Sequence, residues 1–437
     1  MQRRNMALLA AATAAGLTIA GCGGGGDSGG GSGGGGSAAS SAALTGTGPI
    51  TLVQGKDTSG FVQDILDTWN KEHPDQEVRL IELPESADAQ RSQMIQNAQA
   101  KSDAYDVLVV DNVWTAEFAA NRYIVQLPEA EFPVGEMMKP VIDSAKYLDK
   151  LYAVPNSSDG GMLYYRTDLM KAANISAPPK TWDEMKQACK KIQATSEGKG
   201  VNCYAGQFEK YEGLTVNAAE AINSAGGVIT DESGKPNVNT PEAKAGLDFL
   251  VNSFKDGTIP KEAITYKEEE GRRAFQEGKL IFHRQSPYQY NLANAKDSSV
   301  AGKFAVAPLP GMSGPGVSSL GGHALGISSF SKNKKTALDF IKFYTTKEQS
   351  QKYLELASQA PIYTSIYDDP ALQKKFPYLT VLKESILSAK ARPKVVRYGD
   401  ATQAIQDAAY GALTGATTTD AALSQLQTKL EGMTSQQ

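Results

Sequence analysis

Short apolar runs rich in β-branched residues alternate with segments of helical periodicity, and this alternation restricts the fold more than any other feature of the chain. The run Ile50-Thr-Leu-Val53 precedes four apolar residues spaced to share one helix face: Phe61, Ile65, Leu66 and Trp69. Two further runs, 78–83 and 106–110, flank a helical segment over 87–100. Such alternation predicts an α/β fold with largely parallel sheets. Ligands of these sheets bind beyond the carboxyl ends of strands, so Asp111, directly after the third run, is a candidate binding residue.

The length and charge of the chain narrow its class further. About 390 of the 437 residues follow the N-terminal segment, which is too many for one small core and predicts two lobes. The 44 basic residues nearly balance the 48 acidic ones, so we expect no nucleic-acid partner. The three histidines lie far apart, and no Cys/His spacing predicts a metal site.

The N-terminus has the layout of an export signal. Arg3 and Arg4 precede an uncharged apolar stretch over 6–20 that is too short to span a bilayer, which predicts a signal peptide over 1–21. The segment Ile19-Ala-Gly-Cys22 resembles the lipobox of bacterial lipoproteins, which implies that Cys22 is acylated and holds the protein on a membrane. The Gly/Ser-rich segment 22–44 would then be a flexible tether. The alternative is an ordinary cleaved signal, and the Arg pair leaves the export route open between the general and the twin-arginine pathways.

Two cysteines remain in the body of the chain. Cys189 and Cys203 are 14 residues apart, with the turn-rich stretch 196–200 between them. An exported protein reaches an oxidising compartment, so we expect these residues to form a disulfide, the alternative being two separate buried thiols.

Motifs for catalysis and cofactor binding are missing from the sequence. The nearest approach to a nucleophile elbow, Gly311-Met-Ser-Gly-Pro315, has proline in place of the last glycine. No phosphate-binding loop and no dinucleotide fingerprint is present, so no cofactor is expected. The 18 tyrosines, 3 tryptophans and many amides suit stacking on and hydrogen bonding to a sugar.

Several stretches together resemble the solute-binding proteins of bacterial ABC sugar importers, in particular the trehalose/maltose-binding branch. They occur in the family's order over about residues 50–432: 106–118, 151–155, 159–169, 179–184, 210–214, 306–310, 320–322, 367–370 and 391–393. The resemblance implies the two-lobed periplasmic-binding-protein fold of maltose-binding protein, in which the chain crosses the hinge three times. The crossings would fall near Pro155, Val317 and Ala360. Lobe 1 would then comprise 45–155 with 317–358, and lobe 2 would comprise 156–316 with 359–437.

The same resemblance assigns the sugar-binding residues. Asp111 and Asp159 would accept hydrogen bonds from sugar hydroxyls, Arg392 would donate to the sugar, and Gly321 and Gly322 would line the cleft. From the residues alone, Asp111 could instead cap a helix, Asp159 could lie in a turn, and Arg392 could form a surface ion pair. We expect both Asp111 and Arg392 to be exposed in the open, ligand-free form.

The stacking residues are where this chain departs from its relatives. Close relatives carry tryptophan where this chain has Ser286 and His323, which leaves the identity of the sugar open. Tyr288, Tyr290 or His323 would stack on the sugar instead, and each tyrosine could equally belong to the core. The remaining candidates for ligand binding are Asn112, Trp114 and Arg91, with Trp114 equally able to be a packing residue.

The expected function is that of an extracytoplasmic, lipid-anchored and monomeric sugar-binding subunit of an ABC importer. It would bind an α-linked disaccharide or short oligosaccharide between its lobes and deliver it to the membrane permease without catalysing a reaction. Two alternatives remain at this stage. One is a secreted glycan-cleaving enzyme that uses Asp111 and Asp159 as acid and base, and the other is an adhesin or scaffold that binds no sugar.

Overall fold

The structure, a computed structural model, describes residues 44–57, 60–231 and 233–434. The predicted signal peptide, Cys22 and all but the last residue of the predicted tether lie outside the described residues. Among the helices that are described, none is both long and apolar enough to cross a membrane.

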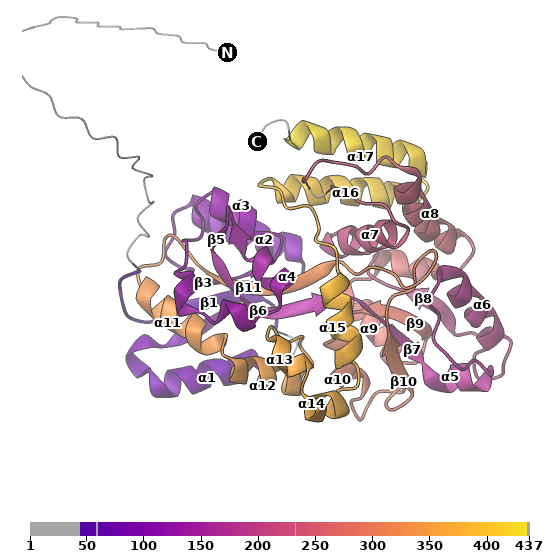
Figure 1. Cartoon of the computed structure of the whole chain (residues 1–437), viewed down its shortest axis with the longest axis horizontal. Coiled ribbons are helices and arrows are strands. Elements are labelled where there is room, and N and C mark those ends of the chain that lie inside the picture. Colours follow the sequence, from indigo (N-terminus) through magenta and orange to yellow (C-terminus); the bar gives the residue numbers. More distant parts are fainter. Residues whose placement is uncertain (1–43, 58–59, 232, 435–437) are drawn as a thin grey trace, which may run out of the picture. The chain divides into compact units, whose positions relative to one another are not determined.

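A five-stranded sheet organises the first lobe (Figure 1), with the strand order β2-β1-β3-β11-β6. Its strands are β1 (Ile50–Gly55), β2 (Val78–Leu83), β3 (Val107–Asp111), β6 (Ala153–Gly160) and β11 (Leu320–Ile327). The three predicted strands are confirmed, and β1 lies parallel to both β2 and β3. Most apolar residues of these strands are buried and form the core of the lobe, together with the predicted helix face that ends in Trp69.

Helices cover both faces of this sheet. In Figure 1 α1 and α11 lie below it and α2 lies above it. The helices associated with the first lobe are α1 (Val62–Glu72), α2 (Ala87–Gln99), α3 (Thr115–Ala120), α4 (Lys139–Ser144), α11 (Lys334–Tyr344) and α12 (Lys347–Ala357). Smaller elements of this part are the hairpin β4 (Lys146–Tyr147) with β5 (Lys150–Leu151) and 3-10 turns at Pro74–Gln76, Glu129–Glu131 and Val134–Glu136.

A four-stranded sheet with the order β10-β7-β9-β8 organises the second lobe. Its strands are β7 (Met162–Arg166), β8 (Asn202–Ala205), β9 (Leu280–Gln285) and β10 (Phe304–Ala307). Its helices include α5 (Thr167–Ala172), α6 (Trp182–Gln193), α7 (Glu212–Ser224), α8 (Pro241–Lys255), α9 (Glu268–Gln276) and α10 (Gln289–Ala293), with a 3-10 turn at Lys261–Thr265. A buried ion pair between Glu220 of α7 and Arg284 of β9 fixes α7 to this sheet.

The last part of the chain is helical. It comprises α13 (Thr364–Tyr367), α14 (Pro370–Lys375), α15 (Leu379–Ser388), α16 (Tyr398–Leu413) and α17 (Thr419–Thr434). Helix α15 packs against β6 and β7, and α16 packs against α7 and α17 (Figure 1). These helices therefore close the second lobe.

The prediction of largely parallel sheets is wrong. Only β1–β2, β1–β3 and β8–β9 are parallel, whereas β11 runs antiparallel to β3 and β6, and β7 runs antiparallel to β9 and β10. The reason is topological: β11 returns to the first sheet after the chain has built the second one, rather than through a short helical crossover beside its neighbour.

Gly161 alone separates β6 of the first sheet from β7 of the second. Its N–H donates to Ser318 Oγ at 2.6 Å, and its carbonyl accepts from Ser385 Oγ at 2.9 Å. A Cβ here would lie 2.7 Å from a carboxylate oxygen of Glu220, so the position has no room for a side chain. The predicted residue boundaries of the lobes remain predictions, although β6 continues beyond Pro155 to Gly160.

Two local features connect α6 with its surroundings. Thr181 and Glu184 form a capping box at the start of α6, because Thr181 Oγ1 accepts from the Glu184 N–H and Glu184 accepts from the Thr181 N–H. Cys189 of α6 and Cys203 of β8 are joined by a disulfide, with their Cα atoms 5.4 Å apart. The disulfide ties α6 to the edge of the four-stranded sheet.

Candidate functional site

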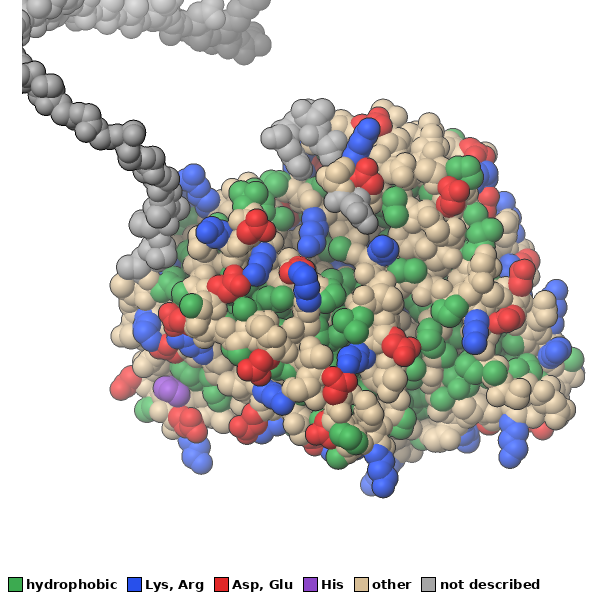
Figure 2. All heavy atoms as spheres, in the orientation of Figure 1, with side chains coloured by type: hydrophobic (Ala, Val, Ile, Leu, Met, Phe, Trp, Pro, Cys, Tyr) green, Lys and Arg blue, Asp and Glu red, His purple; other side chains and the backbone are tan. Residues whose placement is uncertain are grey.

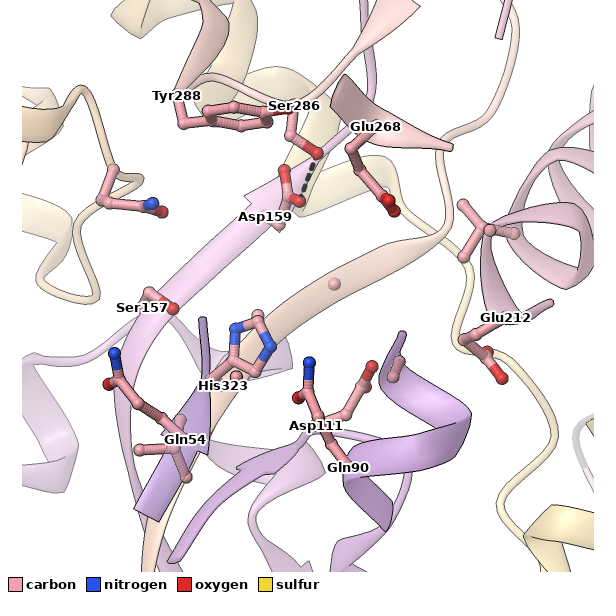
Figure 3. A pocket seen from close by; sticks show the side chains of 18 of the residues that line it. Gln54, Gln90, Asp111, Ser157, Asp159, Glu212, Glu268, Ser286, Tyr288 and His323 are labelled. Atoms are coloured by element: carbon pink, nitrogen blue, oxygen red, sulfur yellow. Dashed lines mark hydrogen bonds between the residues drawn. The ribbon is translucent and has the colours of Figure 1, made fainter. Parts of the chain in front are cut away.

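A cavity of about 340 Å³ is lined by residues of both lobes. Its lining from the first lobe includes Gln54, Gln90, Asp111, Ser157, Asp159 and His323 (Figure 3). The second lobe contributes Gln207, Tyr211, Glu212, Glu268, Arg284, Ser286 and Tyr288, and Arg392 lies between α15 and α16. Amides, hydroxyls and charged groups that converge on one cavity of this size are typical of a small-molecule site.

Asp111 lies at the carboxyl end of β3 and reaches the cavity, as its sequence position predicts. It pairs in register with His323 of β11, which also faces the cavity. Its Oδ1 accepts from the N–H of Val113 at 3.2 Å and from Nη2 of Arg392 at 3.0 Å. The carboxylate therefore stabilises the turn before α3 and also meets a cation at the cavity wall.

Arg392 connects the two lobes beneath the cavity. It is only 4% exposed, and Nη2 donates to Asp111 and to Asn112 Oδ1, both at 3.0 Å. On the side of the second lobe, Nη1 donates to the carboxylate of Glu212, which starts α7, and to the hydroxyl of Tyr398 in α16. Nε of Arg392 has no hydrogen-bond partner among the described residues.

Glu212 is the buried counterpart of Arg392. Besides Arg392 it accepts from the hydroxyls of Tyr398 and Thr402, while its own N–H donates to Asp88 of α2 at 3.1 Å. Burial raises the pKa of Glu212, although the Arg392 guanidinium opposes that shift. The contacts of Asp88 and Arg392 with Glu212 therefore fix the arrangement of the two lobes that the structure shows.

Asp159 lies near the end of β6 on the opposite side of β11. Ser286 Oγ donates to Oδ2 of Asp159 at 2.6 Å (Figure 3), whereas Oδ1 is buried without a partner among the described residues. Burial raises the pKa of Asp159, and the hydrogen bond from Ser286 and the charge of Arg284 oppose that shift.

Gly321 and Gly322 allow β11 to approach β6 closely beside the cavity. A Cβ at Gly321 would lie 2.9 Å from Cβ of Asp159, and one at Gly322 would lie 2.5 Å from the carbonyl oxygen of Ser157. Gly322 also has φ of +120°, which side-chain-bearing residues rarely adopt. Both glycines line the cavity, as the resemblance implied.

The second lobe supplies a carboxylate-rich wall. Glu268, Glu269 and Tyr288 line the cavity beside Ser286. The Tyr288 hydroxyl donates to Glu269 at 3.0 Å, and Glu269 also forms an ion pair with Arg272. Burial raises the pKa of Glu268, despite the opposing effect of the nearby Tyr211 hydroxyl.

Four sequence candidates lie away from the cavity lining. Asn112 supports the site instead, because its Oδ1 accepts from Arg392 and its Nδ2 donates to the Leu320 carbonyl at 3.1 Å. Trp114 is 2% exposed and packs on Phe118 in the core. Arg91 forms an ion pair with Glu117, and the ring of Tyr290 packs against Tyr378.

Asp111 and Arg392, which we expect to be exposed in the open form, are largely covered in the arrangement of the lobes that the structure shows. The side chain of Arg392 is 3% exposed and that of Asp111 13%, because each is a partner of the other. Sequence reasoning also missed Gln54, Glu212 and Glu268. Gln54 could have been found by the rule that selected Asp111, since it follows the run Ile50-Thr-Leu-Val53 at the same edge of the sheet.

Comparisons with known proteins identify the family of the chain. The family model for bacterial extracellular solute-binding proteins matches residues 53–351. A probable ABC transporter-binding protein from Deinococcus radiodurans is 34% identical over 375 residues, which cover 83% of this chain and 88% of the relative.

Solved structures show the same architecture. The maltose-bound MalE3 of T. maritima is 33% identical and superposes with a TM-score of 0.83, covering 88% of this chain and 99% of that one. A solute-binding protein of an ABC transporter from Agrobacterium vitis S4, solved with D-mannitol, is 26% identical with a TM-score of 0.74 and covers 90% and 99% of the two chains. These likenesses confirm the two-lobed α/β fold that the sequence predicted.

Proposed function

Because the chain belongs to the family of bacterial extracellular solute-binding proteins, we propose that it binds an α-linked disaccharide or short oligosaccharide and delivers it to the permease of an ABC importer. Membership of this family also makes the chain a binding protein rather than an enzyme, which excludes the glycan-cleaving alternative. Its place of action is extracytoplasmic.

The observation that carries the proposal is the interlobe cavity with its converging amides and carboxylates. Gln54 and Gln90 from the first lobe face Asp159 and Glu268 across it (Figure 3). Vicinal hydroxyls of a sugar both donate and accept, so an amide and a carboxylate can bind neighbouring hydroxyls at once. The bound maltose of the T. maritima relative, at 33% identity, supports a disaccharide as the first ligand to test.

The mode of action would be closure of the two lobes around the sugar. The sugar would be bound by Asp111 and Asp159 of the first lobe and by Glu212, Glu268 and Tyr288 of the second. A ligand can contact both lobes at once only in the closed form, so its binding shifts the equilibrium toward that form. The closed monomer would be the form that the permease recognises.

We further propose that Cys22 carries a lipid anchor. The support is the sequence Ile19-Ala-Gly-Cys22 in front of a Gly/Ser-rich segment. Replacing Cys22 by serine should move the protein from the membrane fraction to the soluble fraction without changing its melting temperature. Retention of the variant in washed membranes would contradict the anchor.

A thermal-shift screen tests the ligand. Maltose and trehalose should raise the melting temperature, because a ligand at a hundredfold excess over its Kd adds about 2.7 kcal/mol to the free energy of unfolding. D-mannitol should raise the melting temperature less. Gln54→Ala should reduce the ligand-induced shift while leaving the ligand-free melting temperature unchanged, because the Gln54 side chain faces the cavity. The matched control is Gln63→Ala, an exposed glutamine of α1, which should leave both values unchanged. A shift with mannitol but with neither disaccharide would indicate that the ligand is a polyol. The absence of a shift with any saccharide would contradict sugar binding itself.

A further inference from the structure

The charges around the cavity do not balance. Seven Asp and Glu residues line it, against the cationic side chains of Lys56, Arg284 and Arg392. An excess of buried carboxylates is unfavourable unless cations or hydrogen-bond donors compensate each of them. A carboxylate of the cavity that lacks a cationic partner in the protein therefore indicates which charged group the ligand should carry.

The two buried cations are already engaged. Arg284 donates through Nε and Nη2 to Glu220, both at 2.7 Å, and through Nη1 to Gln207 at 3.1 Å. Arg392 is shared between Asp111 and Glu212. Neither guanidinium forms an ion pair with the wall at Ser286.

Two carboxylates beside Ser286, Asp159 from the first lobe and Glu268 from the second, have no ion-pair partner among the described residues. Oδ1 of Asp159 is also buried without any donor in the described part of the chain. Figure 3 shows both carboxylates beside Ser286 and facing the cavity. Glu269, next in the chain, differs from them because Arg272 and Tyr288 satisfy it.

A neutral hydroxyl could supply the missing donor for Oδ1 but would leave both charges in place. Burial raises the pKa of both carboxyl groups, and the charge of Arg284, which is already paired with Glu220, only partly opposes that shift. A metal ion is a poor candidate, since no group of three His, Cys, Asp or Glu residues suited to one occurs in the described part of the chain. An ammonium group has three donors and one positive charge, so it could bridge two carboxylates.

From this imbalance we propose that the ligand is an amino sugar, whose protonated amine lies between Asp159 and Glu268. The inference rests on the proposed function, because the rest of the saccharide would occupy the cavity near Gln54, Gln90 and Ser157. Amides and a hydroxyl at that end suit neutral sugar hydroxyls, so the site would distinguish an aminated from a neutral ring at one end only.

Isothermal titration at neutral pH with D-glucose, D-glucosamine and N-acetyl-D-glucosamine tests the proposal, followed by trehalose and 6-amino-6-deoxytrehalose. The amine-bearing sugar should bind about tenfold to a hundredfold more tightly than its neutral counterparts, because it gains a charge-assisted hydrogen bond. The N-acetyl sugar keeps the nitrogen but not the charge, and it should behave like the neutral sugar.

Variants locate the effect. Asp159→Asn and Glu268→Gln should each lose most of the preference for the amine while still binding the neutral sugar. Glu85→Gln removes an exposed carboxylate from the same cavity and should keep the preference. Melting curves of the ligand-free variants verify that each one is folded.

The possible results separate this inference from the proposed function. Binding of neutral sugars with equal or higher affinity than amino sugars would overturn the inference alone, as would a preference that survives in both wall variants. Failure of every saccharide to bind would overturn both.

Discussion

Replacement of Arg392 tests the buried contact between the lobes most directly. Its side chain is 3% exposed, that of Glu212 is 6% exposed, and Arg392→Ala removes the cation that Glu212 and Asp111 share. Removing one partner of a buried ion pair typically costs about 3 to 5 kcal/mol, because a charge is left without compensation. We expect a loss of that size in the ligand-free protein.

Urea denaturation without ligand, followed by circular dichroism and tryptophan fluorescence, measures this loss. The two probes are needed because a two-lobed protein can unfold in steps. The control is Arg273→Ala, whose ion pair with Glu270 is 51% and 41% exposed and should contribute less than about 1 kcal/mol. The double variant Arg392→Met with Glu212→Gln should recover much of the stability, since it removes the buried charge together with its partner.

An unfolding curve of Arg392→Ala that matches the curve of the Arg273→Ala control would contradict this expectation. Arg392 would then contribute no more than an exposed arginine, and the interlobe contact would have no role in the stability of the ligand-free protein. A loss of sugar affinity without a loss of stability would instead favour the role that the sequence resemblance assigned to it, a direct contact with the ligand.

Three further outcomes are expected. Gly322→Ala should lower the free energy of unfolding by more than about 1 kcal/mol, because φ at this position is +120° and the new Cβ would lie 2.5 Å from the Ser157 carbonyl oxygen. Gly135 has open space around it, so Gly135→Ala should be close to neutral, and thermal melting compares the two variants. Replacing Cys189 and Cys203 together by alanine should lower the free energy of unfolding by about 3 kcal/mol, the value for a loop of this length, and wild-type protein that alkylates at both cysteines without reduction would contradict the pairing. Asp159→Asn should stabilise the ligand-free protein at neutral pH, because burial raises the pKa of Asp159 and so disfavours its charged form in the fold. The gain should shrink as the pH falls through that raised pKa, where the wild-type carboxyl is already protonated, and a gain that is independent of pH in urea titrations would argue against a buried charge as its cause.

Local features of the fold could be predicted from the sequence because they depend on neighbouring residues. The apolar runs at 50–53, 78–83 and 106–110 became β1, β2 and β3, and Thr181 with Glu184 caps α6 as its spacing predicts. The position of Asp111 at the cavity followed from one rule about strand ends. The antiparallel strands were not predictable in this way, because β11 and β6 are far apart in the sequence, with most of the second lobe between them.

The ion pairs of the site could not be predicted from the sequence either, because they join residues that are far apart in the chain. Arg392 meets Asp111, 281 residues away, and Glu212, 180 residues away. No local pattern records such pairings, so each of these residues could be identified only as a separate polar position. The resemblance selected Asp111 and Arg392 individually, but it gave no indication that they bind each other.

The short link at Gly161 has a mechanical consequence. One residue spans less than about 3.6 Å even when fully extended, so β6 and β7 cannot be drawn apart, although the strands can pivot about the link. In a single-molecule pulling experiment with handles on the two lobes, this link would carry load from the start of the extension. Its hydrogen bonds to Ser318 and Ser385 would be among the first to break. A glycine-serine insertion after Gly161 should increase the extension reached at low force, whereas the same insertion in the turn at Gly234 should leave that extension unchanged.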